Sequence, residues 1–382
     1  MARDIEKRLK QLGDRRRGTD SLGRLNGAAQ VEVLMKSLTD EAWQKRAQSQ
    51  PHTRYALGAM QEVGPEYTQI SLNTANRVGK QLNEGLSSRG WEVDFRLQGS
   101  VPLNVHIRGV SDVDLLTLDT DFLTYFNAGP RARAGLYGSP STESSVNRLL
   151  RLRRDSEAVL KAKYPAATID TSGGKCIAMS GGSLERPVDV VPSHWLDTIG
   201  YQTSGQERDR GVVILNKKVP ETIDNLPFLH IGRIHDRDQH ESAGGLKKSI
   251  RLCKNVKNDA IEDGKKINLP SFDLAAIMYH SNQAVLRTGA YYELAVLSET
   301  QRFLDYLYND KTFARSLTVP DGSRFIFDDE TKFDGLLTLS VEMDELAREV
   351  AKEQNALLRL KSEIPFHDAR SALESALLPR FP

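Results

Sequence analysis

The most informative segment of this 382-residue chain is QGSVPLNVHIRGVSDVDLL, residues 98–116. Side chains alternate between the two faces of a β-strand, so Asp112 and Asp114 are predicted to lie on one face. Two carboxylates held side by side are ligands that a pair of divalent metal ions can share. Upstream, Gly99 and Ser100 form a small turn in which backbone N–H groups and a hydroxyl can approach a phosphate. The segment therefore predicts a phosphate-binding turn that faces a set of metal ligands.

A third carboxylate is expected on a neighbouring strand, between apolar residues. The segment PVDVVP, residues 187–192, supplies Asp189 in this setting, and eleven residues lie between Ser100 and Asp112. A single Asp-x-Asp pair is a weak signal, whereas this ordered set resembles the pattern of the polymerase-beta-like nucleotidyltransferase superfamily. The resemblance implies that Asp112, Asp114 and Asp189 are the catalytic acids and that they hold two Mg²⁺ or Mn²⁺ ions.

The composition excludes several classes of protein. The chain has 52 basic and 51 acidic residues, and this net charge of +1 argues against a nucleic-acid coat protein or a membrane-surface binder. Its two cysteines, Cys176 and Cys253, are too few for a disulfide framework or a Cys-rich zinc site. The charged amino terminus lacks the apolar core of a signal peptide, and no stretch approaches the roughly 18 apolar residues of a membrane span. We therefore expect a cytoplasmic protein with no membrane partner.

The spacing of apolar residues predicts where helices, strands and loops lie. A long helix is predicted over residues 67–86, and Gly90 can terminate it. Strands over residues 167–180 and 184–191 are predicted to pair antiparallel, which places Asp189 on the partner strand. The other predicted elements are a helix over 38–46, a loop over 126–140, a helix capped by Ser141 or Thr142 that runs to 163, a strand over 210–217, a loop rich in His and Asp, and helices over 246–259, 271–282, 291–308 and 334–360.

These elements predict an α+β fold of two lobes, a polymerase-beta-like nucleotidyltransferase. Residues 1–220 are expected to form the nucleotidyltransferase core, with a mixed sheet that carries the carboxylates, N-terminal helices and a long spine helix over about 65–88. The pattern turns helical beyond residue 220. Residues 221–382 are expected to form a C-terminal helical lobe that completes the nucleotide pocket.

The predicted helix over residues 246–259 has a basic edge. Lys247, Arg251 and Lys254 fall at i, i+4 and i+7, so they share one stripe beside an apolar one. Such a stripe can bind a triphosphate, although a basic helix edge is more often solvated surface. In the following helix Ser271 is read most simply as an N-cap, and a helix N-terminus also attracts phosphate. Phe272 either stacks on a base or enters the core, and its residue type alone favours the core.

Other clusters of polar residues are given simpler interpretations. The run of three arginines at residues 15–17 is predicted to be solvated surface. Four arginines of the predicted helix that ends at residue 163 are predicted to form a solvated face balanced by acidic neighbours, not a nucleic-acid contact: Arg148, Arg151, Arg153 and Arg154. Three histidines and an aspartate share one predicted loop, but no cysteine is near them, so a structural zinc site is not expected: His230, His235, Asp236 and His240.

With these motifs in this order, residues 60–310 resemble the bacterial cGAS/DncV-like nucleotidyltransferases. The resemblance implies that Ser100 and Lys254 hold the triphosphate of a nucleotide. It also implies that Ser271 touches the far end of that triphosphate and that Phe272 stacks on a nucleobase. Lys247 and Arg251 are candidates for further contacts with the nucleotide.

The resemblance also implies an activity and partners. Members of the family join ribonucleoside triphosphates into a cyclic di- or trinucleotide, a second messenger of bacterial antiphage (CBASS) signalling. A separate effector binds the product and not the enzyme. Some relatives are regulated by conjugation of their C-terminus or by peptide-binding proteins, but the ending Leu-Pro-Arg-Phe-Pro fits conjugation poorly. The sequence lacks the zinc insertion and basic arms of the animal relatives, so a nucleic-acid activator is not expected.

Two alternatives are compatible with the same motifs. One is a nucleotidyltransferase that acts on an RNA or protein acceptor, and the other is a catalytically silent nucleotide-binding scaffold. Three converging carboxylates argue against the scaffold, because they repel one another when no cation binds between them. The bases, the ring size and the linkage of a cyclic product are left open at this point, with a preference for a ring that contains a purine.

Overall fold

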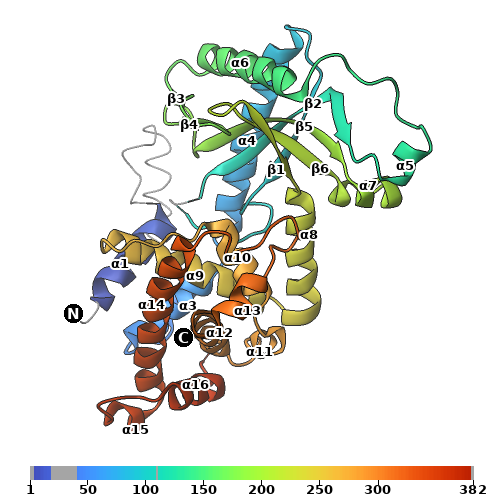
Figure 1. The fold of residues 1–382 in the computed structure, drawn as a ribbon. Coiled ribbons are helices and arrows are strands. Elements are labelled where there is room, and N and C mark those ends of the chain that lie inside the picture. The colour runs from blue at the N-terminus through green and yellow to red at the C-terminus, as the bar shows by residue number, and fades with distance from the viewer. Residues whose placement is uncertain (1–3, 19–40, 109–110, 380–382) are drawn as a thin grey trace.

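The structure, a computed structural model, describes residues 4–18, 41–108 and 111–379. In these residues the strands form one mixed sheet in the order β1-β2-β5-β4-β3, and β6 pairs with both β5 and β7 (Figure 1). β2 and β5 run parallel, so a long crossover connects them. The strands are β1 (Val93–Gln98), β2 (Val113–Tyr125), β3 (Thr168–Asp170), β4 (Ile177–Ser180), β5 (Val188–Asp197), β6 (Gly211–Asn216) and β7 (Glu221–Asn225).

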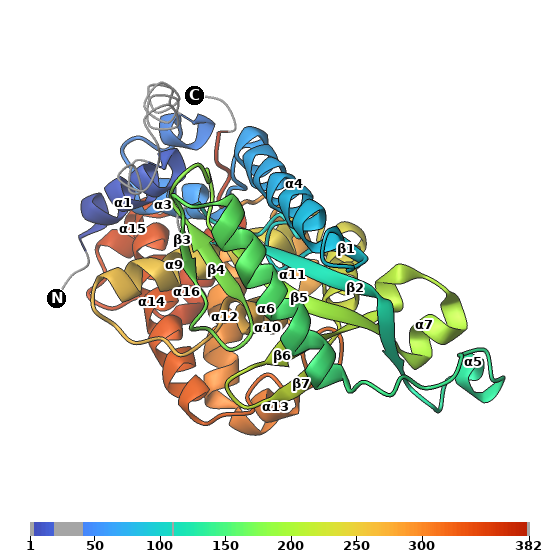
Figure 2. The ribbon, with the colours of Figure 1, turned by 90° about the horizontal axis from the view of Figure 1, so that it is seen from above.

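Two long helices cover one face of the sheet. α4 (Pro65–Ser87) packs against β1 and β2, and α6 (Ser145–Lys163), which lies in the crossover, packs against β5 (Figure 2). Val78, Leu82 and Leu86 of α4 are fully buried at helical spacing. Each such side chain contributes roughly 1.5–3 kcal/mol by leaving water. The predicted spine helix is confirmed.

The other face of the sheet turns toward the helical lobe. It carries a smaller apolar cluster of β2, β5 and β6 side chains, which includes Leu116, Val191 and Trp195. α8 (Pro227–Arg237) covers this cluster with Phe228, whose ring centroid lies 5.8 Å from that of Trp195. Because side chains alternate along a strand, the acidic residues two positions before Leu116 and Val191 share this face.

The helical lobe is built around α9 (Gly245–Glu262), whose side chains Leu246, Ile250 and Cys253 are fully buried. Helices on several sides contact it, among them α3, α10, α12 and α14. The helices that follow α9 are α10 (Ser271–Tyr279), α11 (Gln283–Thr288), α12 (Ala295–Asn309), α13 (Lys311–Ser316), α14 (Thr331–Gln354), α15 (Ala356–Arg359) and α16 (Phe366–Ser375). The two-lobed α+β fold is as predicted, and no helix in the described residues is long and apolar enough to cross a bilayer.

Two N-terminal helices belong to the helical lobe. α1 (Ile5–Arg17) and α3 (Pro51–Met60) pack against α9, and α3 also contacts α14 (Figure 1). The predicted solvated arginine run is wrong for Arg15, which is buried and lies 2.8 Å from the carboxylate of Asp259 in α9. Arg8 is buried in the same way, 2.7 Å from Asp263. Carboxylates of α9 and of its C-cap therefore pair with basic residues of α1, and Arg15 is one that the sequence alone assigned to solvent.

Several predicted boundaries need correction. α6 begins after Ser144, not after Ser141 or Thr142, because the Ser144 hydroxyl accepts the N–H of Asn147 at 3.3 Å. The helix predicted over 38–46 is the short 3₁₀ turn η2 (Ala42–Lys45), and its first residues lie outside the described ones. Within the helical lobe, α14 ends at Gln354 and α15 follows it. The remaining short elements are α5 (Pro130–Arg133), which lies in the predicted loop over 126–140, α7 (Ile199–Ser204), η3 (Glu207–Asp209) and η4 (Asp238–Ser242).

Three elements differ in kind or length from the prediction. β5 continues through Pro192, predicted to be its end, as far as Asp197. β7 replaces the helical pattern predicted after residue 220, because its backbone pairs with β6. α8 occupies part of the segment predicted to be a loop rich in His and Asp, and it buries His230 and Ile234. The sheet thus extends beyond residue 220.

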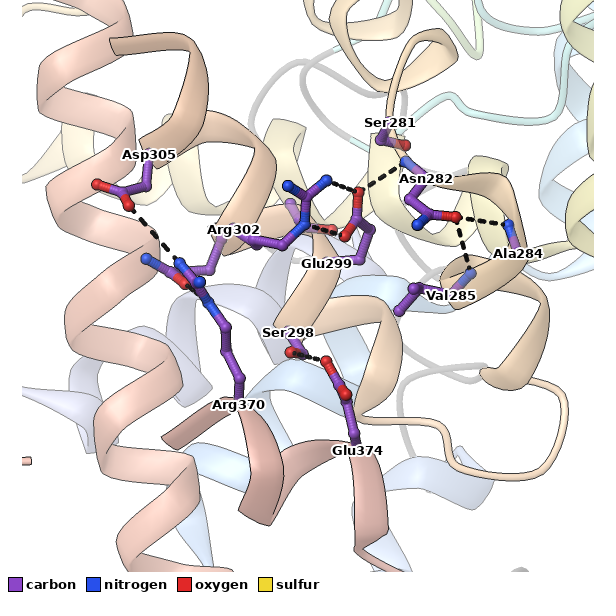
Figure 3. A network of polar contacts seen from close by, with 12 residues as sticks. Ser281, Asn282, Ala284, Val285, Ser298, Glu299, Arg302, Asp305, Arg370 and Glu374 are labelled. Atoms are coloured by element: carbon purple, nitrogen blue, oxygen red, sulfur yellow. Dashed lines mark hydrogen bonds and ion pairs between the residues drawn. The ribbon is translucent and has the colours of Figure 1, made fainter. Parts of the chain in front are cut away.

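The last helix, α16, is joined to α12 by polar contacts (Figure 3). The hydroxyl of Ser298 in α12 donates to Glu374 of α16 at 2.8 Å. Next to Ser298, the fully buried carboxylate of Glu299 pairs with Arg302 at 2.6 Å and accepts the N–H of Asn282 at 2.7 Å. These contacts fix the turn that leads into α11 against the end of the chain.

Candidate active site

The strands that carry the predicted carboxylates are neighbours in the sheet. β2 and β5 are parallel, and Asp114 lies directly opposite Asp189. The N–H of Val113 donates to the carbonyl of Pro187 at 3.1 Å, so pairing begins just before the acids. Asp112 directly precedes β2. The structure therefore brings Asp112, Asp114 and Asp189 together where the two strands begin.

Burial and the neighbouring carboxylates make ionisation of Asp114 costly. Burial raises the pKa of Asp114 to about 7, and the charges of Asp189 and Asp112 add to the increase, while Lys254 opposes it. Burial also raises the pKa of Asp189. A cation bound among these groups would favour their charged forms and lower both pKa values.

Gly99 lies against Asp114. Its φ of +76° is in the left-handed region, and a Cβ at this position would lie 2.2 Å from Oδ2 of Asp114. The carbonyl of the next residue, Ser100, accepts the N–H of Val105 at 3.1 Å and closes a turn. A turn with no side chain at Gly99 therefore lies beside the central carboxylate, as the spacing predicts. Its role in binding phosphate stays a prediction.

Lys254, a residue of α9, contacts the segment that leads into Asp112. Its Nζ donates to the carbonyl of Val105 at 2.8 Å and to the hydroxyl of Ser111 at 3.2 Å. Burial lowers the pKa of Lys254 to about 7, although the charge of Asp114 opposes this. Lys254 thus contributes positive charge beside the carboxylates, and its predicted contact with a triphosphate is untested.

Cys176 is a neighbour of the third acid that the sequence patterns did not single out. It lies just before β4, whose Ala178 is opposite Asp189 in the antiparallel pair β4–β5. Burial raises the pKa of the Cys176 thiol to about 12, and the charge of Asp189 and a hydrogen bond to it add to the increase. The thiol therefore stays protonated and can donate to that carboxylate. The predicted strand pairing pointed to this neighbourhood but did not give the register.

The donor set suits a hard divalent cation. Carboxylate oxygens are the ligands that Mg²⁺ and Mn²⁺ prefer. A bound cation would oppose the burial and the neighbouring charges that raise the pKa of Asp114. In the described residues no group of three or more His, Cys, Asp or Glu side chains is arranged as the ligands of a bound metal ion. Like charges repel, so three carboxylates are not expected to converge without a cation between them. The residues fit the predicted metal ions, and the ions themselves stay a prediction.

Ser271 and Phe272 open α10, but not in the predicted way. Ser271 is the first helical residue and Pro270 occupies the N-cap position, so the predicted N-cap role of Ser271 is wrong. Phe272 is 37% exposed, which contradicts its assignment to the core. Its ring stacks on that of His230 with centroids 4.0 Å apart, and the guanidinium of Arg324 lies 5.4 Å from its centroid. The contacts of both residues with a nucleotide stay predictions.

The structure does not bring Lys247 and Arg251 to the carboxylates. Arg251 is 5% exposed, and its guanidinium donates to the carbonyls of Met60 at 2.8 Å and Asn104 at 2.7 Å. The Nζ of Lys247 lies 3.0 Å from Nδ1 of His235 and 3.8 Å from the carboxylate of Asp238 in η4. These contacts join α9 to α3, to the segment between β1 and β2 and to η4. They do not support a nucleotide-binding role for Arg251, because its guanidinium already donates to backbone carbonyls.

Arg186 is a second residue that the patterns missed. It directly precedes the predicted segment 187–192, and its Nη2 donates to the carbonyl of Ser111 at 2.7 Å. Ser111 in turn directly precedes Asp112. No periodicity could have found this contact, because it joins the entrances of two strands that are far apart in the sequence.

Known proteins resemble this chain along most of its length. A family model for the cGAS/DncV-like nucleotidyltransferase C-terminal helical domain matches residues 235–336. The cyclic dinucleotide synthase CdnE of Yersinia aleksiciae is 40% identical over 358 residues, which cover 91% of this chain and 92% of that protein. A c-di-GMP synthase of a Lachnospiraceae bacterium (strain RUG226) is 33% identical and covers 62% of this chain and 72% of its own.

A solved structure agrees with the sequence comparisons. The STING-associated CdnE c-di-GMP synthase from Capnocytophaga granulosa superposes with a TM-score of 0.66 at 28% identity, over 90% of this chain and 97% of its own. Similarity in sequence and fold over nearly the whole length confirms the predicted fold and enzyme class. The chain belongs to the cGAS/DncV-like nucleotidyltransferases, a family of cyclic oligonucleotide synthases.

Proposed function

We propose that this enzyme joins two ribonucleoside triphosphates into a cyclic dinucleotide at the site formed by Asp112, Asp114 and Asp189. The observation that carries the proposal is the pairing of Asp114 with Asp189 on adjacent parallel strands, with Asp112 at the entrance to the first. A two-nucleotide ring is favoured over a larger one because the relative from Yersinia aleksiciae is named a cyclic dinucleotide synthase.

The proposed chemistry uses the chain's residues mainly to hold charge and position. A ribose hydroxyl of one nucleotide attacks the α-phosphorus of the other, and pyrophosphate leaves. The turn at Gly99 and Ser100 holds the phosphates, and Lys254 balances part of their charge. Asp189 accepts the proton of the attacking hydroxyl. Asp112, Asp114 and Asp189 would hold a divalent ion, which would neutralise further charge and lower the pKa of that hydroxyl.

Guanosine triphosphate is the substrate that we expect to be used first. Relatives from a Lachnospiraceae bacterium and from Capnocytophaga granulosa, each 33% identical, are named c-di-GMP synthases. The first transfer joins two guanosine nucleotides and the second closes the ring, and the two transfers have the same chemistry. A protein that makes it therefore needs a single triphosphate and one set of acids.

We also propose that the product is a messenger of antiphage defence and that a separate effector binds it. The solved relative from Capnocytophaga granulosa is described as STING-associated, which supports an effector that recognises a cyclic dinucleotide. A cytoplasmic location, regulation through conjugation or peptide-binding proteins, and independence from a nucleic-acid activator stay predictions.

The direct test offers the purified protein each ribonucleoside triphosphate alone and in pairs, with Mg²⁺ or Mn²⁺. Products that resist phosphatase are then identified by chromatography and mass spectrometry. A resistant dinucleotide from guanosine triphosphate alone would support the full proposal, whereas one that needs a second triphosphate would correct the bases. Product that forms only on added RNA or protein would favour the alternative acceptor.

The matched controls are two aspartates of β2. Asp114→Asn should abolish product, and Asp121→Asn should not, because Asp121 is about half exposed and lies toward the other end of the strand. Equal product from both variants would exclude the proposed site.

A further inference from the structure

Ser111, the residue before Asp112, is held from several sides. Its N–H donates to the carbonyl of Ile107 at 3.1 Å, and its hydroxyl accepts the N–H of Ile107 at 3.1 Å. Lys254 donates to the same hydroxyl, and Arg186 donates to the Ser111 carbonyl at 2.7 Å. A carbonyl and the residue that follows share one planar peptide unit. Fixing the carbonyl of Ser111 therefore fixes the direction in which the chain enters Asp112.

Arg186 links the entrances of the two strands that carry the acids. Its backbone lies directly before Pro187, whose carbonyl accepts the N–H of Val113. Asp189 follows three residues later in β5. The side chain of Arg186 crosses to the Ser111 carbonyl at the start of β2. One residue thus connects the backbone that positions Asp189 with the backbone that positions Asp112.

Tyr67 of α4 supports the guanidinium of Arg186. The guanidinium carbon lies 4.1 Å from the Tyr67 ring centroid, and that of Arg108 lies 4.5 Å from the same centroid. Arg108 also donates to the carbonyl of Arg16 at the end of α1, at 3.0 Å. A planar guanidinium that rests on an aromatic ring keeps the directions of its N–H groups fixed. The stack therefore aims Arg186 at the Ser111 carbonyl.

Burial separates this role from substrate binding. Arg186 is 7% exposed and Tyr67 is 6% exposed. The guanidinium of Arg186 rests on the Tyr67 ring and donates to a backbone carbonyl, so its printed contacts are with the protein itself. A lysine at this position would keep the charge of Arg186, but its ammonium group is not planar. It could not stack on the Tyr67 ring and hold a fixed direction toward the Ser111 carbonyl.

We propose that Arg186, held on the ring of Tyr67, is a positioning residue that sets Asp112 relative to Asp114 and Asp189. This inference rests on the proposed function in one respect, namely that the three acids bind a divalent ion together. Arg186 acts through the Ser111 carbonyl and does not touch the substrate. When the guanidinium is removed, the Ser111 carbonyl loses the donor that fixes its direction, and Asp112 shifts although the contacts of Ser111 with Ile107 and Lys254 remain. A displacement of about 1 Å at a catalytic group can lower a rate by roughly 100-fold.

The first experiment compares Arg186→Met and Arg186→Lys with a matched control, Arg210→Met. The Arg210 guanidinium lies 4.4 Å from the Trp195 ring centroid and pairs with Asp197 at 2.6 Å, at the far end of β5. We expect both Arg186 variants to lower kcat by roughly 10- to 100-fold with little change in KM for the triphosphate. Arg210→Met should keep its kcat while losing a similar amount of thermal stability. Full activity of Arg186→Lys would overturn the proposal, because charge alone would then suffice.

The second measurement is binding of Mn²⁺ alone to the free protein, followed by electron paramagnetic resonance. Asp114→Asn defines the site by losing the bound ion. Arg186→Met should bind Mn²⁺ at least about fivefold more weakly than the wild type and need correspondingly more metal for half-maximal activity. Wild-type affinity in Arg186→Met would refute the positioning role. If the wild-type protein makes no cyclic product, the proposed function fails, but Mn²⁺ binding still decides this inference.

A pair of Tyr67 variants decides the question if the Arg186 variants do not fold. Tyr67→Phe keeps the ring that supports the guanidinium and should keep both kcat and Mn²⁺ affinity. Tyr67→Leu removes the ring and should lower both, with KM for the triphosphate unchanged. Equal activity and Mn²⁺ binding in the two variants would contradict the proposal.

Discussion

At Gly99 the chain has no room for a side chain, because a Cβ would lie 2.2 Å from Oδ2 of Asp114. Gly99→Ala should therefore displace the central carboxylate and lower activity at least about 100-fold. Initial rates of product formation measure this loss. The left-handed φ of +76° adds a stability cost of roughly 1–2 kcal/mol for any residue with a Cβ.

Gly90→Ala is the matched control for that substitution. Gly90 has a φ of +81°, but an added Cβ meets no atom within 4 Å. The two variants should lose similar stability, measured by urea unfolding, and only Gly99→Ala should lose activity. Full activity of Gly99→Ala would show that Asp114 is not held where catalysis needs it.

Two basic residues of α9 are expected to respond differently to the loss of charge. Lys254→Met should raise KM for the triphosphate by about tenfold or more, because a cation beside the carboxylates is removed. Arg251→Met should instead lower the free energy of unfolding by roughly 1.5–3 kcal/mol, because its buried guanidinium donates to the carbonyls of Met60 and Asn104. Steady-state kinetics and urea unfolding separate the two effects. An unchanged KM in Lys254→Met would remove it from the phosphate site.

The sequence was sufficient to predict that the three acids lie beside one another, because their signal is local. Alternation along a strand gave Asp112 and Asp114, and the apolar neighbours of Asp189 marked a second strand. Arg186 and Cys176 carry no such signal, because their partners lie on strands whose pairing the chain specifies only after folding. The basic stripe misled for Arg251 for a related reason, since spacing cannot show that carbonyls of α3 and of the 99–108 segment cover it.

Among the helices, α12 holds a buried ion pair that should matter for stability and not for chemistry. Glu299 is fully buried, pairs with Arg302 and accepts the N–H of Asn282 (Figure 3). Glu299→Ala should lower the free energy of unfolding by about 2–3 kcal/mol, because it leaves a backbone donor and a guanidinium without their partner. Glu374→Ala, the exposed control in α16, should cost under about 1 kcal/mol. If urea unfolding gives the same loss of free energy for both variants, the burial of Glu299 does not increase its contribution to stability.

Elements with a clear apolar period were predicted well, and those held by pairing alone were not. α4 and α9 have apolar stripes that identify them as helices. β7 has the sequence ETIDN, with a single apolar residue, and becomes a strand because the edge of β6 is available to it. Proline in β5 suggested an end, yet Pro192 lies within a strand paired on both sides. Local propensity was overridden by the sheet in both strands.

Across the whole molecule, Glu353 joins α3 to the end of α14. Burial alone would raise its pKa, but hydrogen bonds from His52 and Thr53 of α3 outweigh burial and lower it. The stabilising contribution of Glu353 is therefore complete above the ordinary pKa of a glutamate and is lost as pH falls through the lower pKa of the folded state.

This linkage predicts a pH-dependent difference between the wild type and Glu353→Gln. The difference in free energy of unfolding should be constant near neutral pH and shrink below about pH 4.5. Glu349→Gln, on the exposed side of the same helix, should show a small difference with no such trend. Denaturant unfolding from about pH 3 to about pH 7 measures both, and a difference that grows toward acid pH would contradict the linkage.

The contacts between elements favour a different division into lobes from the predicted one between residues 220 and 221. The sheet runs to Asn225 at the end of β7, while α1 and α3 pack with α9. We propose that the sheet lobe comprises α4 to β7 and that the helical lobe combines α1 and α3 with everything from α8 onward. Limited proteolysis should then release no stable fragment that begins at residue 221, because that fragment lacks α1 and α3.

The placement of α1 and α3 has a consequence for synthesis on the ribosome. Asn255, a partner of Arg15 in α9, lies 240 residues further along the chain. α1 and α3 contact each other but emerge from the exit tunnel before α9, and the whole sheet lobe can fold before they meet that partner. During that interval the apolar surfaces that will pack on α9 are exposed and prone to aggregation. We therefore expect chaperones to bind the first sixty residues of the nascent chain. The remaining helices of the same lobe are translated last.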